Sequence, residues 1–118
     1  MLLIVDDNIK FIGRLIDLLV LSGIDKTIIT ANDYDGAIKL IAINKPTIVL
    51  LDINMHGKSG IEVLHYIKQE GWYCKVVMVS NHSDKSYKNI CMDAGADYFI
   101  DKSRDFVKIP NCIKELAG

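Results

Sequence analysis

The stretch Thr47-Ile48-Val49-Leu50-Leu51-Asp52 decides the fold, because four large aliphatic residues run straight into one aspartate. A short, unbroken apolar run of this kind is typical of a strand that is buried on both faces of a parallel sheet. Ligands bind such sheets in the crevice beyond the carboxyl ends of the strands. Asp52 is expected at that edge, either as a functional residue or simply as a turn or helix-capping residue.

Similar short apolar runs lie on both sides of this stretch and alternate with segments of helical period. The predicted strands are residues 2–5, 27–31, 47–52, 75–80 and 97–101, and the predicted helices are residues 9–21, 33–43, 61–69, 83–94 and 110–116. Five strands alternating with five helices predict an α/β protein, in which helices cover both faces of a parallel sheet and right-handed crossovers join the strands. The strand at 27–31 is less apolar at its ends, which favours a place at a sheet edge.

Local signals predict where several helices begin and end. Asp7 or Asn8 is the expected N-cap of the first helix, and Gly23 is its expected stop. Pro110 suits the first turn of the last helix, and the connection before it, residues 103–108, is mostly polar.

Length and composition favour one globular domain over residues 1–118, with half of the residues hydrophobic and a quarter charged. The 14 basic and 15 acidic residues give a net charge of -1, which favours neither direct nucleic-acid contact nor membrane binding. The three cysteines, Cys74, Cys91 and Cys112, show no metal-ligand spacing, as expected for free thiols in a reducing compartment. No apolar run approaches the roughly 18 residues of a membrane helix. These features predict a cytoplasmic protein.

Five side chains able to carry chemistry stand at or just past the predicted strand ends. They are Asp6 and Asp7 after the first strand, Asp52 on the third, Ser80 on the fourth and Lys102 after the fifth. In a doubly wound sheet these ends can share one crevice. Three crowded carboxylates repel one another unless a cation neutralises them, and an all-oxygen cluster suits Mg²⁺. Each residue read alone could instead be a cap, a turn residue or a solvated charge.

The same set suits phosphoryl transfer, in which a protein mainly positions groups and stabilises charge. A carboxylate can itself be the nucleophile and form an aspartyl-phosphate. Asp52 is the candidate, because it lies on the central strand between the acid pair and the lysine. Lys102 and Ser80 offer an ammonium and a hydroxyl to a phosphoryl group.

The chain resembles the receiver domain of two-component response regulators, of the CheY-like superfamily, over nearly its whole length. The resemblance is carried by Val5-Asp6-Asp7-Asn8, Leu51-Asp52-Ile53-Asn54-Met55, Gly60-Ile61-Glu62-Val63-Leu64, Val79-Ser80 and Gly95-Ala96-Asp97-Tyr98-Phe99-Ile100-Asp101-Lys102. It implies a flavodoxin-like fold with strand order 2-1-3-4-5.

The resemblance also implies that Asp52 accepts phosphate from a histidine kinase or a phosphotransfer protein, while Ser80 and Lys102 bind the phosphoryl group. Such a domain assists its own phosphorylation and dephosphorylation but acts primarily as a signalling switch. By the same resemblance Mg²⁺ is held by the carboxylates of Asp6, Asp7 and Asp52 and by the backbone carbonyl of Asn54.

In this family a residue equivalent to Ser80 moves toward the phosphoryl group and is coupled to an aromatic residue on the fifth strand. That aromatic residue is Phe99 here, and Tyr98 beside it is expected to point to the other sheet face. The surface affected is formed by the fourth helix, the fifth strand and the fifth helix, and it is a possible site for a dimer. The downstream partner is an output domain or a separate protein.

Three positions depart from the family pattern. His56 replaces a common proline, which leaves the loop after Asp52 less constrained, and Ser103 replaces the proline that commonly follows the lysine. Phe99 replaces a frequent tyrosine and lacks its hydroxyl. His82 lies two positions after Ser80, and we hypothesise that it affects the attack of water on the acyl phosphate.

Two other functions fit the predicted fold. A pseudo-receiver would use it as a protein-binding module without being phosphorylated, although the complete set of five residues argues against this. A flavin-binding protein would need phosphate-binding donors after the first strand. Asp6 and Asp7 would instead repel the flavin phosphate.

Overall fold

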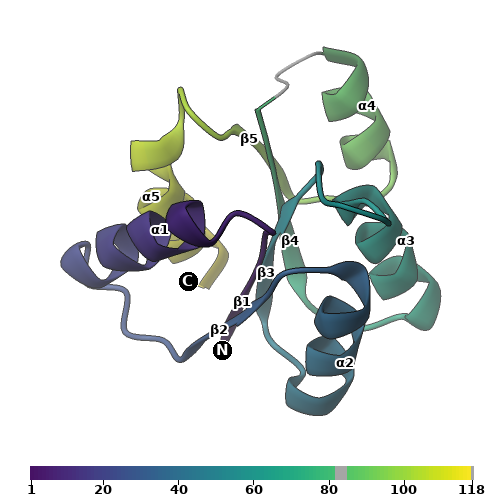
Figure 1. Ribbon diagram of the computed structural model, residues 1–118, viewed down its shortest axis with the longest axis horizontal. Helices are drawn as coiled ribbons and strands as arrows, with labels where there is room; N and C mark the ends of the chain where they lie inside the picture. The colour runs from purple at the N-terminus through teal and green to yellow at the C-terminus, as the bar shows by residue number, and fades with distance from the viewer. Residues whose placement is uncertain (82–84, 118) are drawn as a thin grey trace.

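The structure, a computed structural model, describes residues 1–81 and 85–117 as a parallel sheet between two layers of helices (Figure 1). Helices α1 and α5 cover one face of the sheet, and α2, α3 and α4 cover the other. The strands are β1 (Leu2–Val5), β2 (Ile28–Ala31), β3 (Ile48–Asp52), β4 (Lys75–Ser80) and β5 (Tyr98–Asp101). The helices are α1 (Ile9–Leu21), α2 (Tyr34–Asn44), α3 (Gly60–Glu70), α4 (Lys85–Asp93), α5 (Ile109–Ala117) and the short 3₁₀ helix η1 (Phe106–Lys108).

The strands lie in the order β2-β1-β3-β4-β5, and every neighbouring pair is parallel. This confirms the predicted fold class and strand order. β3 is the central strand and is buried along its whole length, as its unbroken apolar sequence indicates. β2, which is less completely buried, lies at the edge, as predicted.

The apolar strands supply two cores at once, because successive side chains point to opposite faces of the sheet. On β3, Val49 and Leu51 pack under the layer of α2, α3 and α4, whereas Ile48 and Leu50 pack under α1 and α5. The three cysteines are free and buried in these cores, which agrees with a packing role.

Short-range hydrogen bonds set the ends of several helices. The Asn8 side chain accepts from the backbone N–H of Phe11 and caps α1, which decides between the two predicted capping residues. The α3 helix carries a capping box formed by Ser59 and Glu62 and ends at Gly71, which has a positive φ of 69°.

The segment between β5 and α5 contains one element that the prediction lacked. The polar connection after β5 includes η1, whereas α5 begins at Ile109 and has Pro110 in its first turn, as predicted. The backbone of this segment is held by local bonds: the Asp101 carboxylate accepts from the backbone N–H groups of Ser103 and Arg104. A pattern of apolar spacing does not detect such side-chain-to-backbone bonds. The predicted helix start at Ser83, and His82, lie outside the described residues.

Candidate functional site

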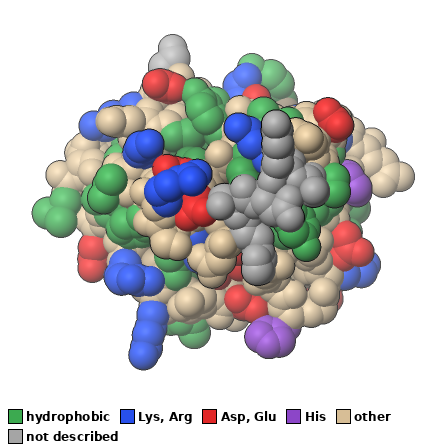
Figure 2. All heavy atoms as spheres, turned by 90° about the horizontal axis from the view of Figure 1, so that it is seen from above, with side chains coloured by type: hydrophobic (Ala, Val, Ile, Leu, Met, Phe, Trp, Pro, Cys, Tyr) green, Lys and Arg blue, Asp and Glu red, His purple; other side chains and the backbone are tan. Residues whose placement is uncertain are grey.

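Three carboxylates lie together at the carboxyl edge of the sheet. Asp6 and Asp7 follow β1, Asp52 ends the adjacent β3, and one oxygen from each lies within 4.8 Å of the others. Asp6 is 1 % exposed and Asp52 is 4 % exposed, so both charges are largely withdrawn from water. Figure 2 looks onto this edge and shows acidic and basic side chains beside one another.

The turn between β1 and α1 fixes the position of Asp6. Asp6 Oδ1 accepts a hydrogen bond of 2.8 Å from the backbone N–H of Asn8, whose own side chain caps α1. Asp6 Oδ2 is fully buried, and apart from the ion pair with Lys102 it has no hydrogen-bond partner among the described residues. One oxygen is therefore used for local structure, while the other faces the site.

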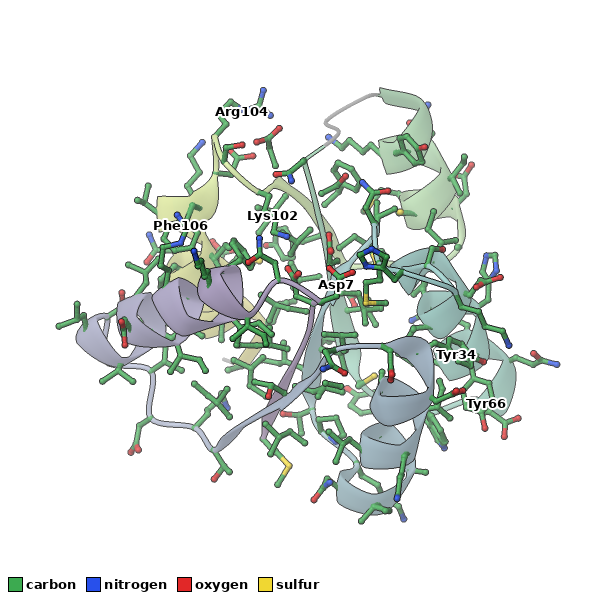
Figure 3. All side chains as sticks on the ribbon, viewed as in Figure 1. Asp7, Tyr34, Tyr66, Lys102, Arg104 and Phe106 are labelled. Carbon is green, nitrogen blue, oxygen red and sulfur yellow. The ribbon has the colours of Figure 1, made fainter. Side chains whose placement is uncertain are left out.

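Lys102, directly after β5, brings a buried ammonium into this cluster (Figure 3). Its Nζ lies 2.7 Å from Asp6 Oδ2 and 3.8 Å from Asp52 Oδ2, and it stands 4.3 Å from the centre of the Phe11 ring. The Lys102 backbone N–H donates to the carbonyl of Ser80 at 2.8 Å, so the end of β4 holds the lysine backbone in place. Lys102 thus pairs closely with Asp6 and more loosely with Asp52.

Burial and the neighbouring charge of Asp6 raise the pKa of Asp52 from 3.8 to about 7, although Lys102 and a backbone hydrogen bond from Asn54 act in the opposite direction. The single buried ammonium does not compensate for three acids. The arrangement is therefore one that a bound cation would relieve, and the all-oxygen donor set fits a hard ion such as Mg²⁺. This fit rests on the chemistry of the three carboxylates.

His56 is a contact of the site that the sequence did not reveal. Asp7 Oδ2 lies 2.7 Å from His56 Nδ1 and accepts a hydrogen bond of 3.0 Å from the His56 backbone N–H. Partial burial opposes ionisation of Asp7, but these hydrogen bonds and the histidine charge outweigh it and lower the pKa of Asp7. The two residues are 49 positions apart, and they meet only because β1 and β3 are neighbours.

The remaining predicted residues occupy the same edge or the strand beside it. Ser80 is fully buried at the end of β4, and Asn54 lies in the loop after β3. Phe99 is half-buried against the core under α2, α3 and α4. Tyr98 packs against the opposite core, as the alternation predicted, and its hydroxyl donates to Glu115 on α5.

The strand order, the acidic cluster and the buried lysine define a doubly wound α/β domain with a charged site at its carboxyl edge. Residues 2–114 match the family model described as the response regulator receiver domain. The chain belongs to this family, the receiver domains of two-component response regulators.

Curated relatives agree with this assignment. The chain is 29% identical over 100 residues to the DNA-binding transcriptional activator EvgA of Escherichia coli, a match that covers 85% of this chain and 48% of EvgA. It is 33% identical over 103 residues to the transcriptional regulatory protein KdpE of Mycobacterium tuberculosis, covering 86% of this chain and 44% of KdpE. The chain thus spans about half the length of these relatives.

A solved structure supports the same fold. A DNA-binding response regulator of the LuxR family from Staphylococcus aureus matches with a TM-score of 0.88 and 28% sequence identity, over 99% of this chain and 98% of that one.

Proposed function

We propose that this receiver domain accepts a phosphoryl group on Asp52 from a histidine kinase or a phosphotransfer protein. The observation that carries the proposal is the position of Asp52, which ends the central strand beside two other carboxylates and 3.8 Å from the Lys102 ammonium. An Asp52 carboxylate oxygen attacks phosphorus, while the bond from phosphorus to the donor nitrogen breaks and its electron pair leaves with that nitrogen. Lys102 and the Ser80 hydroxyl then stabilise the phosphoryl oxygens.

The same site is proposed to hold Mg²⁺. The carboxylates of Asp6, Asp7 and Asp52 and the backbone carbonyl of Asn54 would be the protein ligands, and the bound ion would neutralise charge on the acids and on the phosphoryl oxygens. The raised pKa of Asp52 supports this assignment, because its cause after burial is the negative charge of Asp6, which would bind the same ion.

His56 is expected to orient Asp7 for the metal, and His56→Ala should weaken Mg²⁺ binding about tenfold. Removing a residue that hydrogen-bonds to a metal ligand typically weakens metal binding about ten- to a hundredfold. We expect the lower value here because the His56 side chain is fully exposed. Isothermal titration with Mg²⁺ measures the change. His65→Ala is the matched control, since His65 is exposed on α3 and lies outside the acidic cluster. An unchanged affinity in His56→Ala would remove His56 from the metal site.

Phosphorylation is proposed to act on the surface formed by α4, β5 and α5, with Ser80 and Phe99 as the switch residues. Ser80 and Phe99 lie on adjacent strands, and β5 is joined to α5 by the hydrogen bond from Tyr98 to Glu115. On α4, Ile90 is 50% exposed, which gives this surface an apolar residue for a partner. A second copy of the chain or a downstream protein could bind there.

We further infer that residues 1–118 form one domain that works with an output domain or a separate effector. The relatives named as transcriptional regulators are about twice as long as the matched region, which supports this view. In the described part of the chain, no helix has the length and apolar character needed to span a membrane. A cytoplasmic location fits a partner such as a histidine kinase.

Incubation with a small-molecule phosphoramidate tests the proposed function. We expect intact-mass spectrometry to show one added phosphoryl group in the presence of Mg²⁺ and none in excess chelator, because the acids then lack their counter-ion. The added group should be released by hydroxylamine, which cleaves acyl phosphates. A protein that stays unmodified with Mg²⁺ present would instead be a pseudo-receiver.

A further inference from the structure

Phe11 contacts the functional group of Lys102, although its position in the first turn of α1 indicates an ordinary core residue. The ring is 3 % exposed and belongs to the core under α1 and α5. The Lys102 ammonium lies over its face, 4.3 Å from the ring centre. At this distance an ammonium is attracted by the negative face of the aromatic ring.

The surroundings of Lys102 explain why this contact matters. A buried ammonium must be compensated on every side from which water is excluded, and Lys102 is only 8 % exposed. Asp6 occupies one side at 2.7 Å, and Asp52 occupies another at 3.8 Å. The Phe11 ring covers a further side of the ammonium.

An aromatic ring suits this place better than another acid would. A third carboxylate around Lys102 would attract the ammonium, but it would also repel an incoming phosphoryl group. The ring attracts the ammonium through its quadrupole and adds no net charge. The ring can therefore hold Lys102 beside Asp52 without adding a further negative charge to the site.

The position of the ring is itself fixed by the site. The Asn8 side chain accepts from the backbone N–H of Phe11, and the Asn8 backbone N–H donates to Asp6. The turn between β1 and α1 therefore fixes the positions of both the Asp6 carboxylate and the Phe11 ring, which contact Lys102. On its other side Phe11 meets Phe106 edge to face, with ring centres 5.8 Å apart. Figure 3 shows Phe106 and Lys102 above the start of α1.

We propose that Phe11 is a positioning residue for phosphoryl transfer, which holds the Lys102 ammonium between Asp6 and Asp52 through the face of its ring. The effect of Phe11 on phosphoryl transfer rests on the proposed function. The contact itself can be tested without phosphorylation.

The test replaces Phe11 with 4-fluoro-, 3,5-difluoro- and 3,4,5-trifluorophenylalanine. These rings keep nearly the same shape, but each added fluorine weakens the negative potential of the ring face. The rate of phosphorylation by a small-molecule phosphoramidate with Mg²⁺ should fall stepwise, by about five- to thirtyfold over the whole series. The same series at Phe106 is the matched control, because it alters the ring pair but not the ring under the ammonium, and its rates should stay within about twofold.

The proposal would be overturned if the phosphorylation rate did not change across the fluorinated variants at Phe11, or if it fell equally across those at Phe106. Either result would show that the Phe11 ring contributes by packing alone. An independent readout is the proton shift of the Lys102 ε-methylene group, which should lie upfield in the unmodified protein because of the ring current. If the protein takes up no phosphate, the proposed function fails and this shift alone decides the contact. An ε-methylene shift at its ordinary position would then show that the contact does not form in solution.

Discussion

The Asp52→Asn variant is expected to take up no phosphoryl group under conditions that fully phosphorylate the protein with Asp52 in place. The amide has the size of the carboxylate but lacks the anionic oxygen that attacks phosphorus, so the chemical step loses its nucleophile. Intact-mass spectrometry after treatment with a phosphoramidate and Mg²⁺ measures the result. Asp35→Asn is the matched control, since Asp35 is an exposed residue in the first turn of α2, and it should be labelled normally.

The same substitution is expected to stabilise the metal-free protein by roughly 2–4 kcal/mol at pH 8. Asp52 is buried beside Asp6, so its ionised form is unfavourable in the folded state. Asparagine removes that charge and fills nearly the same space. A residue that contributes to function would thus be a source of instability when no cation is bound.

The pH dependence of this effect follows from the raised pKa of Asp52, about 7 in the folded protein against 3.8 for the ordinary group. Because the folded protein binds this proton more tightly than the unfolded chain does, proton binding at Asp52 stabilises the fold. This contribution to the free energy of unfolding is fully present below about pH 4 and is lost as the pH rises toward 7. The advantage of Asp52→Asn should therefore be smaller at pH 5 than at pH 8. Urea unfolding in chelator at the two pH values measures the difference.

Two outcomes would contradict these expectations. A labelled Asp52→Asn protein would place the acceptor on another residue. Equal stability of the two proteins at pH 8 would show that Asp52 is not held as an unfavourable buried charge.

Gly60→Ala is expected to lower the free energy of unfolding by about 3 kcal/mol. A Cβ at Gly60 would lie 2.2 Å from the backbone oxygen of Asp52 and 2.9 Å from its carbonyl carbon. Both atoms belong to the backbone, so no side-chain rotation can relieve the overlap. Either the start of α3 or the end of β3 must move, and phosphoryl uptake should fall because Asp52 moves with its strand.

Gly13→Ala is the matched control for this substitution. Gly13 lies within α1, and a Cβ there would meet no atom within 4 Å. Alanine is the better helix former, so this change should stabilise the protein by about 0.5–1 kcal/mol. Urea unfolding of both variants measures the contrast. If Gly60→Ala were as stable as the unmodified protein, the close approach of α3 to Asp52 would be incorrect.

The strands could be predicted because the apolar runs are short, unbroken and separated by helical segments, whereas their order was implied by the resemblance to receiver domains. Leu2–Val5 is a strand in the structure as in the prediction, and β3 begins at Ile48, one residue after the predicted start. The positions of Asp6, Asp52 and Lys102 relative to the strand ends follow from the same pattern. Their roles in phosphoryl transfer stay predictions that the variants above will test.

The local sequence was less informative wherever a structure depends on individual side-chain bonds. The segment after β5 was expected only to be a mostly polar connection. In the structure the carboxylates of Asp101 and Asp105 accept backbone N–H groups there, and η1 forms. Such bonds have no period along the chain. The first turn of α5 does contain Pro110, as predicted.

By itself, the sequence of Thr47 to Asp52 determined a doubly buried central strand with an acid at its carboxyl end, because an unbroken aliphatic run can be covered only from both sides. The tertiary structure alone decided what surrounds that acid. His56 reaches Asp7, and Phe11 lies under the Lys102 ammonium, across separations of 49 positions and more. The physical reason is that a buried charge is governed by every group that replaces its water, and strand order brings those groups together from distant parts of the chain.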